Sequence, residues 1–168
     1  RLAFHKNLLR PAKTAARDDS PVIPTILTTP GGMYERMIRM KLGLITAPCA
    51  SGIERVASFG LNSAEFDINI GSDIDAFEAE LPAMEKEMAR TGVSVDSIGR
   101  WGAGRITIEG PIEEELRTEY RLIDAAARLG TPVYVAGCNA VEGLSFYQNC
   151  TLAIEYMEKL LEYAAPKG

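Results

Sequence analysis

The chain has 168 residues, of which 46% are hydrophobic and 24% are charged, and its formal net charge at pH 7 is −5. This composition excludes an intrinsically disordered chain, and the length allows one domain with a hydrophobic core. Apolar runs stay short of the roughly 18 residues of a membrane span, and no signal-peptide pattern opens the chain. The sequence therefore predicts a cytoplasmic protein with no membrane partner.

Charge divides the sequence near residue 39. Residues 1–39 contain seven Lys and Arg and three Asp and Glu, a balance of +4, whereas residues 40–168 contain 11 and 20, a balance of −9. Affinity for nucleic acid comes largely from neutralising phosphates, which an acidic body does poorly. The charge therefore favours a small-molecule partner over a nucleic acid.

The first 39 residues show no sustained helical or strand period and are interrupted by prolines and by Gly31-Gly32. Such composition predicts an unstructured segment, with a regulatory or docking arm as the alternative. Glu35-Arg36-Met37 can be encoded by a purine-rich run that resembles a bacterial ribosome-binding site. We therefore hypothesise that Met40 is the native start and that residues 1–39 are translated leader.

From residue 40 onward, strand and helix patterns alternate. The expected elements are a strand at 42–46, a helix at 51–60, a strand at 63–68, a helix at 73–91, a strand at 93–98, a helix from Pro111 to Gly130, a strand at 132–136 and a helix at 145–164. Capping patterns at Ser51 with Glu54 and at Ser145 with Gln148 mark two of the helix starts. A Gly-rich excursion, GRWGAGRITIEG, separates the third strand from the third helix.

Strict alternation of four strand–helix units predicts an α/β fold with parallel strands and right-handed crossovers. Residues 40–168 average about 32 residues per unit, close to the roughly 30 of a closed eight-unit barrel of about 250 residues. The sequence thus predicts the first four β/α units of a (β/α)8 TIM barrel. An open four-stranded, doubly wound parallel sheet is the alternative.

Four segments, in this order and spacing, resemble the sugar phosphate isomerase/epimerase family: MKLGLITAP, AEFDI, VDSIGRWG and EELRTEYRLIDAAARLGTPVYVAGCN. That family has the xylose isomerase-like TIM barrel. The resemblance covers about residues 40–168 and corresponds to the N-terminal half of the family's barrel.

The resemblance implies a metal-dependent enzyme that isomerises or epimerises a sugar or sugar phosphate next to its carbonyl. It implies a divalent metal, Mn, Mg, Co or Zn, whose ligands come from later strands, and carboxylates that move the proton. Residues 40–168 contain no histidine, and the only one in the chain is His5. We therefore expect neither metal ligands nor catalytic residues in this chain, and expect the fragment alone to be inactive.

Three other functions stay open in different degrees. An inosose-type dehydratase would share the barrel and the metal. A non-catalytic half-barrel could bind carbohydrate or pair with a copy of itself as a homo-oligomer. Endonuclease IV, a relative of the family, uses histidines on strands three and four, where this chain reads SIGRW and VAGCN, so DNA repair is disfavoured.

Four residues near the expected carboxyl ends of the strands are the predicted substrate contacts, because function lies at that end of such barrels. Glu65 points away from the apolar side of its strand and is predicted to hydrogen-bond a sugar hydroxyl or a catalytic group in the other half of the barrel, or else to pair with Lys41 or Arg100. Trp101, the only tryptophan, could stack on a sugar or anchor the excursion. Arg100 could bind a phosphate or form an ion pair, and Asn139 could bind a hydroxyl.

Overall fold

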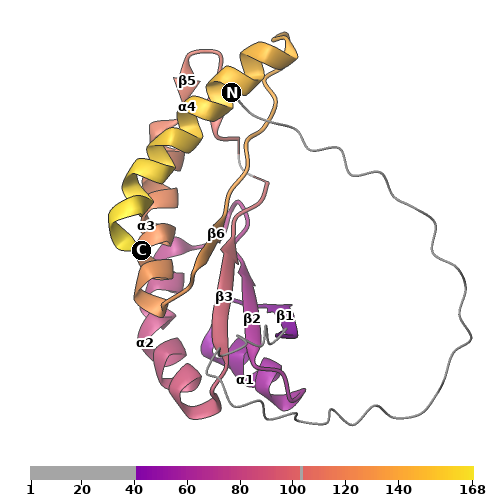
Figure 1. Cartoon of the computed structure of the whole chain (residues 1–168), viewed down its shortest axis with the longest axis vertical. Coiled ribbons are helices and arrows are strands. Elements are labelled where there is room, and N and C mark those ends of the chain that lie inside the picture. The colour runs from indigo at the N-terminus through magenta and orange to yellow at the C-terminus, as the bar shows by residue number, and fades with distance from the viewer. Residues whose placement is uncertain (1–40, 103) are drawn as a thin grey trace, which may run out of the picture. The chain divides into compact units, whose positions relative to one another are not determined.

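The computed structural model describes residues 41–102 and 104–168. The predicted leader at residues 1–39 and the proposed start at Met40 lie outside the described residues. In chain order the elements are β1 Gly43–Thr46, α1 Ala50–Ser58, β2 Ser63–Asp67, α2 Ile74–Thr91, β3 Ser94–Gly99, β4 Ile106–Thr107, β5 Gly110–Pro111, α3 Glu113–Leu129, β6 Val133–Val135, α4 Phe146–Ala164 and the short 3-10 helix η1 Ala165–Lys167 (Figure 1).

The main sheet has four parallel strands in the order β1-β2-β3-β6. Each new strand is added at the same edge, so right-handed crossovers place successive helices on the same face of the sheet. Figure 1 shows α2, α3 and α4 along one side of the strands. A doubly wound sheet would reverse its strand order and carry helices on both faces. The strand order therefore agrees with the predicted barrel units and excludes the doubly wound alternative.

Alternation along β2 assigns the two faces of the sheet. Ala64, Phe66 and Ile68 are at most 1% exposed and belong to the core formed with the helices. The intervening Glu65 and Asp67 therefore lie on the opposite side, which we call the open face because no helix of the described chain covers it. The predicted alternation of β2 is confirmed.

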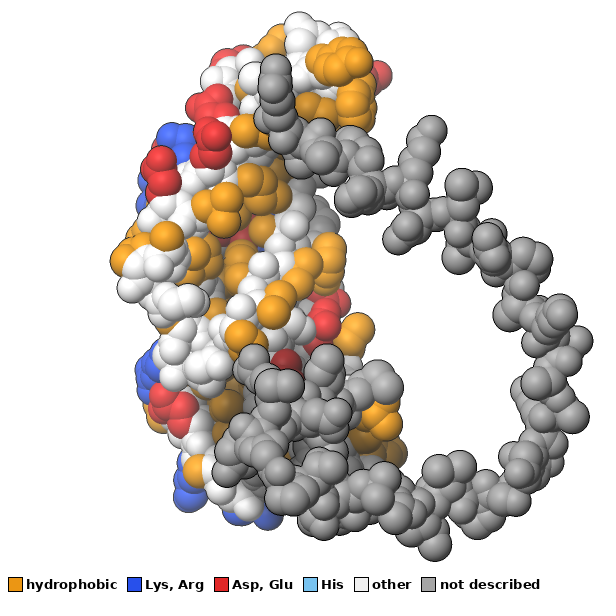
Figure 2. All heavy atoms as spheres, viewed as in Figure 1, with side chains coloured by type: hydrophobic (Ala, Val, Ile, Leu, Met, Phe, Trp, Pro, Cys, Tyr) orange, Lys and Arg blue, Asp and Glu red, His pale blue; other side chains and the backbone are white. Residues whose placement is uncertain are grey.

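A second, smaller core joins α3 to α4. Its buried members are Ile106, Leu116, Ile123, Tyr156 and Leu160. At the start of α4, the predicted capping box is confirmed, because Ser145 and Gln148 exchange both expected hydrogen bonds. In the space-filling view, Lys and Arg side chains gather along the helix side of the protein (Figure 2).

Two predicted helix starts are wrong. The first helix begins at Ala50 with Cys49 as its N-cap and has no side-chain cap, so Ser51 and Glu54 form no capping box. The third helix begins at Glu113, and Pro111 instead pairs with Ile106 in the β4–β5 hairpin. Proline suits both places, because a first helical turn and a short edge strand equally tolerate its missing N–H.

Lys41 and Ser63 hold the carboxylate of Asp96 near the amino ends of the strands. The Lys41 Nζ lies 3.1 Å from Asp96 Oδ1, and Ser63 Oγ donates to Oδ2 at 2.6 Å. Burial alone would raise the pKa of Asp96, but hydrogen bonds from Ser63, Ser94 and Lys41 outweigh it and lower that pKa. A carboxyl with a lowered pKa stabilises the fold above its unfolded-state pKa of about 3.9, and this contribution is lost as the pH falls through the folded-state value.

The Asp96→Asn variant should therefore lose stability at neutral pH and lose less of it in acid. Urea unfolding at pH 7 and at pH 3 measures both differences. We expect the wild-type and variant midpoints to converge as the pH falls. A difference that stays constant across this range would contradict the assigned role of the carboxylate.

Candidate functional site

The carboxyl ends of the four parallel strands meet at one edge of the sheet. Beyond them run the segments 47–49, 68–70, 100–102 with 104–105, and 136–139. The first of these turns packs closely against Gly52. Only glycine fits there, because a Cβ at this position would lie 2.1 Å from the carbonyl oxygen of Ala47. This edge is where α/β barrels bind their ligands.

Glu65 lies on the open face and accepts a hydrogen bond from Ser97 Oγ at 2.8 Å. The pairings proposed for it with Lys41 or Arg100 are not formed, since those cations bind other carboxylates. Ser97 is placed opposite Glu65 by a bulge in the pairing of β2 with β3. Beside them is a hollow of about 210 Å³ lined by Gly43–Ile45, Ser63–Glu65 and Ser97.

Asp67, Asn69 and Trp101 gather at the carboxyl end of β2 and β3. Asn69 Nδ2 donates to Asp67 Oδ2 at 3.1 Å, while the buried Oδ1 of Asp67 has no partner among the described residues. Asp67 pairs in register with Gly99, and the Trp101 indole folds back over Gly99, where a Cβ would lie 3.1 Å from Nε1. The indole remains 44% exposed and so presents a surface to solvent.

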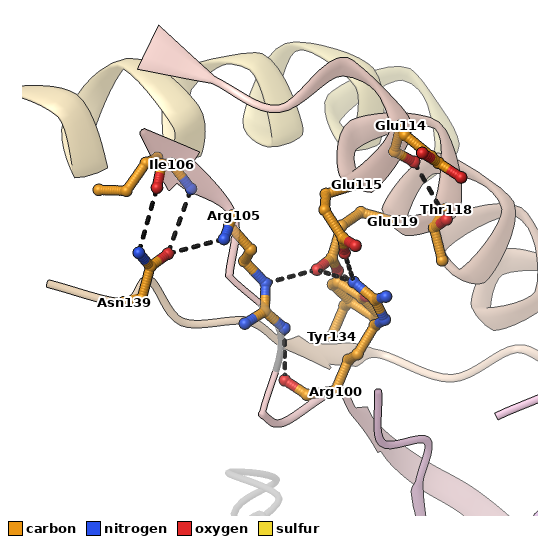
Figure 3. A network of polar contacts seen from close by, with 9 residues as sticks. All are labelled: Arg100, Arg105, Ile106, Glu114, Glu115, Thr118, Glu119, Tyr134 and Asn139. Atoms are coloured by element: carbon orange, nitrogen blue, oxygen red, sulfur yellow. Dashed lines mark hydrogen bonds and ion pairs between the residues drawn. The ribbon is translucent and has the colours of Figure 1, made fainter. Parts of the chain in front are cut away.

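A network of charges centred on Glu119 of α3 holds the excursion in place (Figure 3). Glu119 is 0% exposed, and its Oε1 accepts from Arg105 Nε at 2.7 Å and from Arg100 Nη1 at 3.2 Å. Arg100 also pairs with Glu115, and the Tyr134 hydroxyl donates a hydrogen bond to Glu119. Arg105 further donates to the carbonyl oxygen of Arg100 at 2.7 Å. The two arginines and two glutamates compensate one another's charge.

Burial and charge set the proton affinities here. Burial alone would lower the pKa of Arg100, but its ion pairs with Glu115 and Glu119 raise that pKa overall. Burial raises the pKa of Tyr134, and the negative charge of Glu119 adds to this. Burial also raises the pKa of the Cys138 thiol. Tyr134 and Cys138 therefore stay protonated at neutral pH, and Cys138 is not an activated nucleophile.

Asn139 fastens the excursion to the end of β6. Its Oδ1 accepts from the backbone N–H groups of Arg105 at 2.6 Å and Ile106 at 3.2 Å, and its Nδ2 donates to the carbonyl oxygen of Ile106 at 3.1 Å (Figure 3). A hollow of about 410 Å³ lies between Asn139 and the Trp101 indole. It is lined by Trp101, Gly102, Gly104, Arg105, Gly137, Cys138 and Asn139.

The four predicted contacts thus occupy different positions. Trp101 and Asn139 line the 410 Å³ hollow, and Glu65 lines the 210 Å³ hollow. Arg100 is 5% exposed and is engaged by two carboxylates. Substrate contact by each of them stays a prediction, while the hydrogen bonds of Arg100 and Asn139 show that both order the excursion.

Sequence reasoning did not select Asp67 or Glu119 for the site. The signal for Asp67 was its place beside Phe66 in an alternating strand. The signal for Glu119 was its position three residues after Leu116 on the buried stripe of α3, where a carboxylate requires partners.

Metal binding finds no support in the residues described. Across residues 41–102 and 104–168, no group of three or more His, Cys, Asp and Glu side chains is placed to hold a metal ion. The divalent metal implied by the family resemblance, with ligands expected from later strands, stays a prediction. Among the same residues, no helix is long and apolar enough to cross a membrane.

No protein-family model and no curated protein matches the sequence. Solved structures do match. The 3-keto-D-glucoside 4-epimerase of E. coli has 17% identity and a TM-score of 0.59, covering 77% of this chain and 54% of the epimerase. D-allulose 3-epimerase from a Methylomonas species, in complex with D-allulose, has 18% identity and a TM-score of 0.58, with coverages of 77% and 49%.

D-psicose 3-epimerase from Clostridium cellulolyticum, solved with D-tagatose, has 12% identity and a TM-score of 0.57, covering 77% of this chain and 50% of that enzyme. Further matches include a xylose isomerase domain protein from Planctomyces limnophilus. The chain thus spans about half the length of the solved structures that it matches. At these identities the likeness establishes the fold, and the described residues have the fold of half of a xylose isomerase-like TIM barrel.

Proposed function

We propose that the described residues form the sugar-binding half of an enzyme that isomerises or epimerises a sugar next to its carbonyl. The observation that carries this proposal is the set of groups at the carboxyl ends of β2, β3 and β6. There an exposed indole, Trp101, lies beside a 410 Å³ hollow and next to the carboxylate of Asp67 in the register of the sheet. The sugar epimerases with the same fold support the choice of substrate class.

In this proposal the described residues bind and orient the sugar. An indole offers a flat apolar surface to the C–H face of a sugar ring, and a carboxylate accepts hydrogen bonds from its hydroxyls. The Glu119 network holds the excursion rigidly, so that the indole is already positioned before the sugar arrives. We place the groups that transfer the proton, and the ligands of a divalent metal, outside the described residues.

The surface of α4 favours a second candidate function, a half-barrel that pairs with a copy of itself. An apolar groove of about 440 Å³ is lined by Cys150, Ala153, Ile154, Met157, Glu158 and Leu161. Leu161 is 67% exposed, and β1 and β6 each have one edge unpaired in the described sheet. Such exposed apolar area and open strand edges favour association. A dimeric mass on size exclusion, together with no sugar binding, would favour this candidate.

Sugar binding should be visible in the emission of Trp101, because the chain has one tryptophan. We expect D-allulose or D-tagatose to change its fluorescence saturably. Calorimetry of the Trp101→Ala variant should show at least about tenfold weaker binding, which corresponds to about 1.4 kcal/mol. The control is Ile108→Ala, which removes an exposed apolar side chain from the same excursion and should leave the affinity unchanged. No saturable signal with either sugar would contradict the proposal.

A further inference from the structure

We infer that the carboxylate of Asp67 accepts a hydrogen bond from a hydroxyl group of the sugar and that the site takes a neutral, unphosphorylated sugar. The inference rests on the proposed function and specifies the substrate class of the same site. It starts from a carboxylate oxygen that has no partner among the described residues, beside the one tryptophan of the chain.

The hydrogen bonds of Asp67 are incomplete, in contrast to those of Glu65 on the same face. Its Oδ2 is bound by Asn69, but its buried Oδ1 has no partner among the described residues. Buried polar atoms in proteins nearly always have a partner, so an exception calls for an explanation. A ligand hydroxyl supplies the missing donor. Glu65, two residues earlier on the same face, already accepts from Ser97.

The backbone places the Trp101 indole next to this carboxylate. Asp67 is paired with Gly99, and the pairing continues past the strands, because Ile68 N donates to Gly99 O at 2.8 Å and Ile70 N donates to Trp101 O at 3.0 Å. Neighbouring strands lie about 4.8 Å apart. Gly99 has no side chain, and the indole occupies the space that a Cβ would enter. Carboxylate and indole are therefore neighbours on hydrogen-bonded segments.

The charges at this edge select against a phosphorylated sugar. The arginines of the excursion, Arg100 and Arg105, are both buried against the carboxylates of α3, with Glu119 bound by both and Glu115 by Arg100. Their charge is thereby already compensated, while Asp67 adds a negative charge beside the indole. A phosphate group on the sugar would meet like charge, whereas a hydroxyl finds an acceptor.

The experiment compares D-allulose with the same sugar carrying a 6-phosphate, by calorimetry on the full chain. The wild type should bind the neutral sugar more tightly. Asp67→Asn keeps the shape but removes the charge, so it should weaken binding of the neutral sugar by about tenfold or more and reduce the discrimination against the phosphate. Glu142→Gln, which neutralises an exposed carboxylate elsewhere, is the matched control and should change neither affinity.

A second variant keeps the test decisive if Asp67→Asn folds poorly. In Gly99→Ala the new Cβ would displace the indole, so the Trp101 emission should shift and sugar binding should weaken while circular dichroism stays native. Wild-type affinity in Asp67→Asn, or tighter binding of the phosphate by the wild type, would overturn the inference and leave the proposed function standing. Failure of the wild type to bind either sugar would instead overturn both.

Discussion

Replacement of Glu119 by glutamine should lower the free energy of unfolding by about 3–5 kcal/mol, because it removes one partner of a buried group of charges. The carboxylate is 0% exposed and binds both arginines of the excursion and the Tyr134 hydroxyl. Glutamine retains one carbonyl acceptor but no negative charge, so the ion pairs of Glu119 with Arg100 and Arg105 would both be lost. Urea unfolding followed by circular dichroism at pH 7 measures the loss.

The matched control is Glu114→Gln, which removes the same charge from the first turn of the same helix. The Glu114 side chain is exposed and forms no ion pair among the described residues, so the change should stay within about 0.5 kcal/mol. Emission from Trp101, next to Arg100 in the chain, gives an independent measure: it should shift in Glu119→Gln and not in the control. Equal stabilities of the two variants would show that the network does not hold the excursion.

The strands and helices were predictable because their signals are local. Alternation of Phe66 with Glu65 and Asp67 defines both faces of β2 within a few residues. Gly92 and Gly130 both adopt the left-handed conformation that ends a helix, at the places where the sequence pattern stops. The parallel sheet follows from the regular alternation of these elements, which leaves few other arrangements.

The excursion was not predictable because its partners are distant in sequence. Asn139 binds the backbone of Arg105 and Ile106 from 33 or 34 residues away, and the β4–β5 hairpin contains two residues per strand. So short a hairpin has no periodicity of its own. Glu119 resembles any helical glutamate until Arg100 and Arg105 are brought to it.

The candidate site was predictable in location but not in detail. Parallel strands bring their carboxyl ends together, so the segments containing Trp101 and Asn139 could be chosen from the chain order. The state of each side chain depends on its hydrogen-bond partners: Ser97 satisfies Glu65, whereas one oxygen of Asp67 has no partner among the described residues. Residue type and spacing alone do not predict which of the two carboxylates has a hydrogen-bond partner.

The substitution Phe66→Ala should also cost about 3–5 kcal/mol, because it removes a fully buried aromatic side chain and leaves a cavity. Phe66 lies in the middle of β2, in register with Thr46 on one side and Ile98 on the other. Its ring faces the helices and joins the strand to the core. Guanidinium or urea unfolding at 25 °C measures the loss, and a loss near 1 kcal/mol would show that the helices close over the gap.

The control for this prediction is Phe59→Ala, which deletes the same group where it is 63% exposed, so the free energy of unfolding should change by no more than about 0.5 kcal/mol. The pair also tests how the two faces of β2 are coupled. Phe66 lies between Glu65 and Asp67 in the chain. Loss of its packing against the core should let both carboxylates move. In the folded population, Phe66→Ala should therefore weaken sugar binding, although Phe66 lies on the face away from the hollows. Unchanged sugar affinity in that variant would mean that hydrogen bonds between the strands hold the open face without help from the core.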